Sequence, residues 1–145
     1  MMDDPDAGPV DFRRSLQTLA TYAEVFAAPG FRTGDWEGAA PSGALGQMPY
    51  FAYSPLVVRF IADACAWKWT LDQFDWTSWT KTEEFRRLTT DADVLASATP
   101  RQLQQLITTV LRQDRFAEGT LAEAFDTGLM LGITRRARDM VTGKE

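Results

Sequence analysis

Residues 99–119, TPRQLQQLITTVLRQDRFAEG, lead directly into residues 120–133, TLAEAFDTGLMLGI. Thr99 is an N-cap candidate, with Pro100 at the first helical position and Gln102 three residues after the cap. Thr120 and Glu123 repeat this capping-box pattern after Gly119. The stretch therefore predicts two helices joined by a tight turn, which form a C-terminal helical hairpin.

The rest of the chain also favours helices. Apolar residues at spacings of three and four predict a helix over residues 11–28, and Pro29 with Gly30 ends it. Residues 29–53 are rich in Gly and Pro and read as a long loop, with a short extended piece over 48–53. Further helices are expected over residues 55–67 and 76–88, with a short turn over 91–98 and the last helix over 120–141. The predicted fold class is an all-α single domain of five to six helices over residues 11–141, after a disordered acidic N-terminus over residues 1–10.

Composition limits the functional classes. The chain has 145 residues and no apolar run near the ~20 residues that cross a bilayer. The acidic N-terminus resembles no signal or transit peptide, so we expect the cytoplasm of a bacterial cell. Histidine is absent, which removes the commonest general base and the commonest transition-metal ligand. The only cysteine, Cys65, lies in an apolar helical stretch, where a buried thiol is expected.

The charge pattern weakens the case for nucleic-acid binding. The net charge is -5, from 20 acidic and 15 basic residues. Binding to phosphates needs clustered Lys and Arg, so nucleic acid is expected only through a partner or an arginine cluster. That cluster would combine Arg112 and Arg115 with the run Arg135, Arg136 and Arg138, although a solvated helix end explains the run equally well.

Asp114 and Glu118 lie one helical turn apart and could share a divalent cation. Arg112 and Arg115 lie at the same helix end, so an ion-pair network is the simpler interpretation. No catalytic residue, cofactor or metal site is therefore assigned. An enzyme that uses these carboxylates, with Asp72 or Asp75, remains the alternative.

Aromatic residues are the most prominent candidate for function. Trp67, Trp69, Phe74, Trp76 and Trp79 lie within thirteen residues, and the long loop adds further rings. These rings could fill the core or line a groove for a partner, since Trp, Tyr and Arg are favoured interface anchors. The partner-binding residues predicted on this basis are Trp36, Tyr50, Tyr53, Trp69, Trp76, Trp79, Arg112 and Arg115.

Three motifs carry a family resemblance: YFAYSP at residues 50–55, FDW at 74–76 with Trp79, and LRQDRFAEG at 111–119 followed by Gly128. Together they resemble a family of small bacterial proteins catalogued as domain of unknown function 6508, over roughly residues 20–140. The resemblance implies a helical fold and no known activity. It marks Asp114, Arg115, Phe116, Glu118 and Gly119 as signature positions, which a corner held by ion pairs and a buried phenylalanine would also explain.

These observations predict a small cytosolic helical module that acts by binding a protein partner. A sharper hypothesis is a phage or mobile-element inhibitor of a bacterial defence complex of the CRISPR type, since a compact acidic protein suits a basic nucleic-acid channel. The alternatives are the carboxylate or metal-dependent enzyme and a nucleic-acid-binding accessory protein. Gly128 and Gly132, four residues apart, are expected to admit a closely packed helix, either within the monomer or across a homodimer.

Overall fold

The computed structural model describes residues 9–37 and 50–143, which form eight helices and one two-stranded antiparallel sheet. The elements in chain order are α1 (Pro9–Ala27), β1 (Gly34–Glu37), β2 (Tyr50–Tyr53), α2 (Pro55–Ala66), α3 (Trp76–Trp79), α4 (Glu83–Thr90), α5 (Ala92–Leu95), α6 (Pro100–Phe116), α7 (Thr120–Asp126) and α8 (Leu129–Thr142). The prediction of a mainly helical domain is confirmed. Within the region expected as a loop over residues 29–53, β2 agrees with the short extended piece expected over 48–53, whereas β1 was not predicted. Residues 38–49 lie outside the described part.

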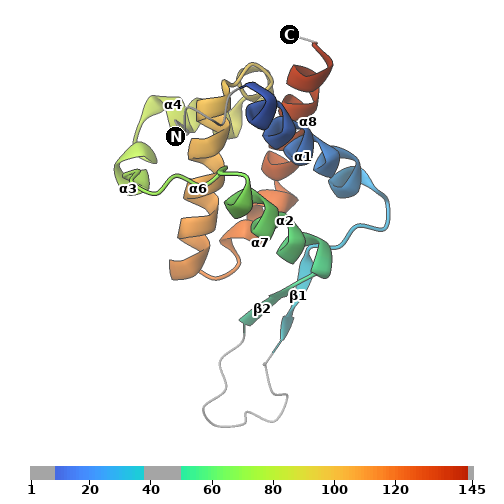
Figure 1. The fold of residues 1–145 in the computed structure, drawn as a ribbon. Coiled ribbons are helices and arrows are strands. Elements are labelled where there is room, and N and C mark those ends of the chain that lie inside the picture. The colour runs from blue at the N-terminus through green and yellow to red at the C-terminus, as the bar shows by residue number, and fades with distance from the viewer. Residues whose placement is uncertain (1–8, 38–49, 144–145) are drawn as a thin grey trace, which may run out of the picture.

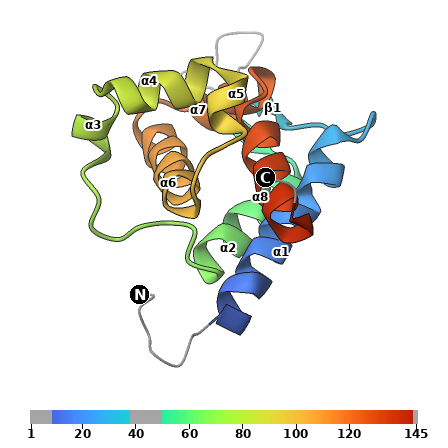
Figure 2. The same ribbon diagram turned by 90° about the horizontal axis from the view of Figure 1, so that it is seen from above.

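The helices pack around α6, and the strands project from one end of the helical body (Figure 1). Seen along the axis of α6, the helices α3, α4 and α5 lie on one side, and α1 and α8 lie on another (Figure 2). Helix α1 packs along α8, while α6 packs against α3 and α7. The end of α6 nearest the strands is its C-terminal end, so the chain reversal between α6 and α7 lies next to the hairpin.

A single hydrophobic core joins the described helices. Leu103, Leu106, Ile107 and Val110 of α6 are almost fully buried, as their spacing predicts for an inward stripe. The same core contains residues of α1, α2, α7 and α8, including Leu19, Phe60, Leu121 and Ile133. The shared core gives the strands a fixed helical platform.

Local capping explains where several helices begin. Thr99 and Gln102 form the predicted capping box of α6, because each side chain bonds to the other residue's backbone N–H. Ser54 caps α2, Asp75 caps α3 and Asp91 caps α5 through side-chain oxygens that accept first-turn N–H groups. These starts follow from residues within four positions of each cap.

Two predicted helices are interrupted. The helix expected over residues 76–88 is divided into α3 and α4, because Thr82 begins a new helix by capping the N–H of Phe85. The helix expected over residues 120–141 breaks at Gly128, whose φ of 86° is left-handed. The capping box expected from Thr120 and Glu123 does not form, because the N-cap of α7 is Gly119, which has no side chain to bond the helix.

The prediction for Gly132 is confirmed and the one for Gly128 is wrong. A Cβ at Gly132 would lie 2.5 Å from a methyl carbon of Leu95, so the absence of a side chain permits the close packing of α5 against α8. A Cβ at Gly128 would meet no atom within 4 Å. Gly128 therefore serves the chain reversal rather than a packing contact.

Two expectations about burial are also corrected. Cys65 is exposed, because α2 turns Val57, Phe60 and Ala64 to the core and leaves Cys65 on its outer face. Arg136 is buried in α8, where its Nε donates to the carbonyl oxygen of Ala98 at 2.8 Å. It therefore does not belong to the basic surface run that the sequence predicted.

In the described ranges, every helix falls short of the length and hydrophobicity that a membrane crossing requires.

Candidate functional site

The β-hairpin projects from one end of the helical body in Figure 1. Its register pairs Gly34 with Tyr53 and Trp36 with Phe51, and the N–H of Ser54 continues the ladder by donating to the carbonyl oxygen of Thr33 at 2.8 Å. A Cβ at Gly34 would lie 2.2 Å from the carbonyl oxygen of Ala52, so no larger residue fits where β1 begins. A two-stranded hairpin is marginal in isolation, so contacts with the helices must stabilise it.

Asp114, near the end of α6, makes the principal contact. Its Oδ1 accepts three hydrogen bonds, from the hydroxyl of Tyr53 at 2.7 Å and from the N–H groups of Gly119 at 3.1 Å and Leu121 at 3.0 Å. The N–H of Leu121 is in the first turn of α7 and has no partner within that helix. One carboxylate therefore caps α7 and holds β2 at the same time.

The environment of Tyr53 keeps its hydroxyl protonated. Partial burial raises the pKa of Tyr53 above its ordinary value, and the hydrogen bond to Asp114 raises it further. The bond therefore joins a neutral donor to a carboxylate acceptor, which makes it stronger than a bond between two neutral groups.

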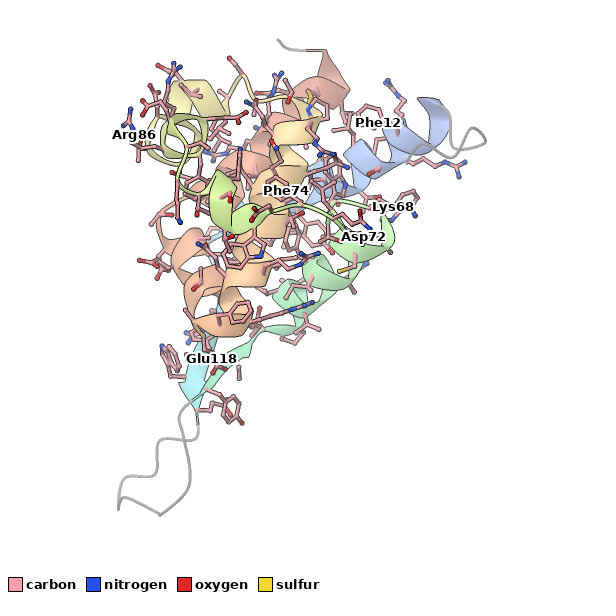
Figure 3. All side chains as sticks on the ribbon, turned by 90° about the vertical axis from the view of Figure 1, so that its left-hand side faces the viewer. Phe12, Lys68, Asp72, Phe74, Arg86 and Glu118 are labelled. Carbon is pink, nitrogen blue, oxygen red and sulfur yellow. The ribbon has the colours of Figure 1, made fainter. Side chains whose placement is uncertain are left out.

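Glu118 provides a second contact between the corner and the hairpin. Its Oε2 accepts the backbone N–H of Phe51 at 3.0 Å, across 67 residues of sequence. Figure 3 places Glu118 where the end of α6 meets the base of the hairpin. The carboxylate thereby satisfies a backbone donor at the edge of β2 that faces away from β1.

Gly119 completes the corner. Its φ of 98° is left-handed, and a Cβ there would lie 3.0 Å from Cζ2 of Trp36. The indole of Trp36 therefore lies over the glycine backbone and makes an edge-to-face contact with Phe51, with ring centroids 5.4 Å apart. The turn from α6 to α7 needs glycine for both its backbone angle and the space that Trp36 uses.

The predicted ion-pair network at this corner is wrong. No ion pair within the described residues joins Asp114 or Glu118 to Arg112 or Arg115. The guanidinium of Arg112 instead donates to the carbonyl oxygen of Leu71 at 2.7 Å, and Arg115 is exposed. The two carboxylates instead accept hydrogen bonds from backbone N–H groups and from a tyrosine hydroxyl.

Phe116 is exposed, where the sequence suggested burial. Its side chain is 81% exposed, and its ring lies 6.1 Å from that of Trp76 in α3. Trp36 and Tyr50 of the hairpin are 55% and 48% exposed. We call the group formed by Trp36, Tyr50, Trp76, Arg115 and Phe116 the aromatic corner.

The other predicted partner-binding residues are wholly or partly buried. Trp69 and Trp79 are buried, and their indole N–H groups donate to the carbonyl oxygen of Ser15 and to the Glu84 carboxylate. Tyr53 and Arg112 are partly buried and committed to internal hydrogen bonds. Of the residues predicted from sequence, Trp36, Tyr50 and Arg115 are exposed and Trp76 is partly buried, and the exposed Phe116 was not among the predicted residues.

The family model DUF6508, described as a family of unknown function, matches residues 12–143. The chain belongs to this family. No curated protein and no solved structure matches it. The signature positions that carried the DUF6508 resemblance divide into two kinds, because Asp114, Glu118 and Gly119 hold the hairpin while Arg115 and Phe116 face outward.

A groove of roughly 610 Å³ between α1 and α2 is a second feature of the surface. Within it, the hydroxyl of Tyr22 donates to Oδ2 of Asp63 at 2.6 Å, and burial together with this bond raises the pKa of Tyr22. Arg14 and Arg59 also line the groove and form no ion pair with any residue that the structure describes. The groove has mixed charge and lies away from the DUF6508 signature.

The described residues offer no metal site. Across residues 9–37 and 50–143, no three Asp, Glu, Cys or His side chains gather in a way that could hold a metal ion. Asp114 and Glu118, the carboxylates that prompted the enzyme alternative, accept hydrogen bonds from protein donors. Both therefore have a structural use that requires no cation.

Proposed function

We propose that this chain is a protein-interaction module and that the aromatic corner is its binding surface. The observation that carries the proposal is the exposure of Phe116, a large apolar side chain that is 81% exposed at the last position of α6. Asp114 holds the turn that follows by accepting the N–H of Gly119. Exposed apolar side chains that gather in one place on a soluble protein mark interaction sites. Trp, Tyr and Arg, three of the corner's residue types, are those favoured at the energetic centres of interfaces.

The rigidity of the corner supports binding with a small entropic cost. Asp114 and Glu118 fix the hairpin to the helical body, so Trp36 and Tyr50 stand on backbone that is already ordered. A surface ordered before binding loses less conformational freedom when a partner arrives. Asp114 and Glu118, two of the positions that carried the DUF6508 resemblance, therefore hold the proposed binding surface in place.

The test is affinity capture with matched variants, using lysate of the cells that carry the gene. Phe116→Ser removes the most exposed ring, while Val58→Ser is the control, because Val58 is 54% exposed on α2 outside the aromatic corner. We expect one protein to be recovered in stoichiometric amount with the wild type and the Val58 variant and to be lost with the Phe116 variant. Recovery of the same proteins with all three chains would contradict the proposal.

A narrower proposal concerns the partner. The net charge of -5 supports docking onto a basic surface, such as the nucleic-acid channel of a bacterial defence complex of the CRISPR type, with the gene carried by a phage or mobile element. Expression of the protein in a strain immune to a phage through CRISPR should then restore plaque formation. Unchanged immunity at confirmed expression would contradict this narrower version and leave the interaction module to be tested by capture.

A further inference from the structure

The two edges of the hairpin differ in whether their backbone groups are satisfied. In an antiparallel ladder, residue pairs alternate between those that exchange hydrogen bonds and those whose N–H and C=O groups point away from the partner strand. The bond from Ser54 to Thr33 marks a bonded pair, so the register makes Trp36 and Phe51 an outward-pointing pair. The donation of the Phe51 N–H to Glu118, outside the ladder, agrees with this assignment.

The outward groups on the two strands meet different surroundings. On β2, Glu118 accepts the N–H of Phe51. On β1, no residue of the described ranges hydrogen-bonds the outward N–H or C=O of Trp36. Asp35, Trp36 and Glu37 are all exposed, and both Figure 1 and Figure 3 show no helix alongside that edge.

We propose that the outer edge of β1 receives an extended, basic segment of a protein partner, which adds a third antiparallel strand to the hairpin. Addition of a strand to an open edge is a recurring mode of peptide recognition, in which backbone bonds give affinity and alternate side chains give specificity. The inference deepens the proposed function and rests on it, since it names the chemistry of the partner at the aromatic corner.

The side chains along β1 favour a basic partner. Alternation places Asp35 and Glu37 on one face of the strand and Trp36 on the other. Arg32 already pairs with Asp35 at 2.7 Å, whereas Glu37 has no ion-pair partner among the residues described. A strand in which basic and apolar residues alternate would place its charge opposite Glu37 and its apolar side chains beside Trp36.

The same charges disfavour a second copy of this chain as the added strand. Two copies of β1 could pair antiparallel through their outward backbone groups. Trp36 of one copy would then lie opposite either Trp36 or Gly34 of the other. In the first register Asp35 faces Glu37 of the other copy, and in the second Asp35 faces Asp35. Like charges directly opposite each other destabilise a sheet, so the edge is better suited to a different, basic chain.

The test uses a capped hexapeptide of alternating Lys and Val and follows amide hydrogen exchange by NMR. In antiparallel addition, Val lies opposite Trp36 and its N–H faces β1, while the N–H of Lys points away. N-methylation of the Val residues should therefore abolish binding, whereas N-methylation of the Lys residues should not. At about ten times its Kd, the unmodified peptide should slow exchange of the Trp36 amide about tenfold.

Two further comparisons isolate charge and backbone. A hexapeptide of alternating Glu and Val should give no protection, and Glu37→Gln should weaken binding of the Lys peptide. Trp36→Ala and Trp36→Pro both remove the indole, but only proline removes the outward N–H, and proline is tolerated at a strand edge. We expect the alanine variant to bind the peptide more weakly than the wild type, because the indole contact is lost, and the proline variant to lose peptide binding altogether.

The outcomes separate this inference from the proposed function. No protection of Trp36 by the Lys peptide, or an equal effect of the two methylated peptides, would overturn strand addition even if Phe116→Ser still abolished capture. Retention of the partner by Phe116→Ser would overturn the aromatic corner as the binding surface and would leave the result at the β1 edge unchanged.

Discussion

The two ends of α6 are closed in different ways. At the N-terminal end, Thr99 and Gln102 satisfy each other's backbone N–H groups within three residues of sequence. At the C-terminal end, Asp114 and Glu118 bond to Tyr53 and Phe51, which lie 61 and 67 residues earlier in the chain. The N-terminal end is capped by local hydrogen bonds alone. The C-terminal end is a tertiary junction that fixes the hairpin.

This difference gives a physical meaning to Asp114 and Glu118, two of the positions that carried the resemblance to DUF6508. A local cap determines where a helix begins, but it positions nothing else. The junction at the C-terminal end positions Trp36 and Tyr50 relative to Phe116, and these three are among the most exposed large side chains described. Changes at the junction should therefore loosen the proposed binding surface, whereas changes at the local cap should not.

The largest effect is expected for Asp114→Ala. The substitution leaves two backbone N–H groups and the hydroxyl of Tyr53 without their acceptor, which should lower the free energy of unfolding by about 3 to 4 kcal/mol. Urea unfolding measures this loss. Asp114→Asn is the matched control, because its amide oxygen retains one acceptor at the same place. An alanine variant as stable as the wild type would show that the junction contributes nothing.

Gly119→Ala should be the next largest. The left-handed φ and the contact of the new Cβ with Trp36 should together cost about 2 to 3 kcal/mol. Gly128→Ala is the control, since its φ of 86° is also left-handed but no atom lies within 4 Å of its Cβ, so only backbone strain of about 1 to 2 kcal/mol is expected. Equal losses of stability in the two variants, measured by thermal unfolding, would mean that the contact between the new Cβ and Trp36 costs nothing.

Tyr53→Phe removes only the hydroxyl from the junction. At neutral pH we expect a loss of about 1.5 to 2 kcal/mol, as for a hydrogen bond to a charged acceptor. Because folding raises the pKa of Tyr53 above 10.0, its contribution is complete below pH 10 and is lost as the pH rises further. Unfolding curves at increasing alkaline pH should therefore fall more steeply for the wild type than for Tyr53→Phe. Parallel curves would exclude this role for Tyr53.

Thr99→Ala, at the other end of α6, should have the smallest effect on stability and none on the hairpin. Loss of the capping box should cost about 1 kcal/mol. Amide exchange in β1 and β2, corrected for the change in global stability, should equal that of the wild type. A selective increase in hairpin exchange would contradict the distinction between the two ends.

The sequence predicts the N-terminal end of α6 well, because all its determinants lie between Thr99 and Gln102. It does not predict the contacts at the C-terminal end, since no residue close to Asp114 in sequence indicates that the hydroxyl of Tyr53 will lie 2.7 Å from its Oδ1. The basic neighbours Arg112 and Arg115 suggested ion pairs instead. Long-range contacts decide the partners of a carboxylate that local spacing leaves open.

The aromatic residues illustrate the same limit. Periodicity identified the inward stripe of α6, but it could not distinguish Trp69 and Trp79, which are buried, from Phe116, which is exposed, or from Trp76, which is partly buried. Trp69 lies after the end of α2, and Trp79 belongs to the four-residue helix α3, so neither lies in a helix long enough to show a clear apolar face. The position of Phe116 depends on where α6 ends, which Gly119 and Asp114 set together.

The most direct test of the junction is the exchange rate of the Phe51 backbone amide in the wild type and in Glu118→Ala. Loss of the carboxylate, which accepts the Phe51 N–H at 3.0 Å, should speed this exchange about tenfold, while the amides of Leu106 and Ile107 in the core of α6 keep their rates. An unchanged rate at Phe51 would contradict the claim that the two carboxylates at the C-terminal end of α6, Asp114 and Glu118, hold the hairpin in place.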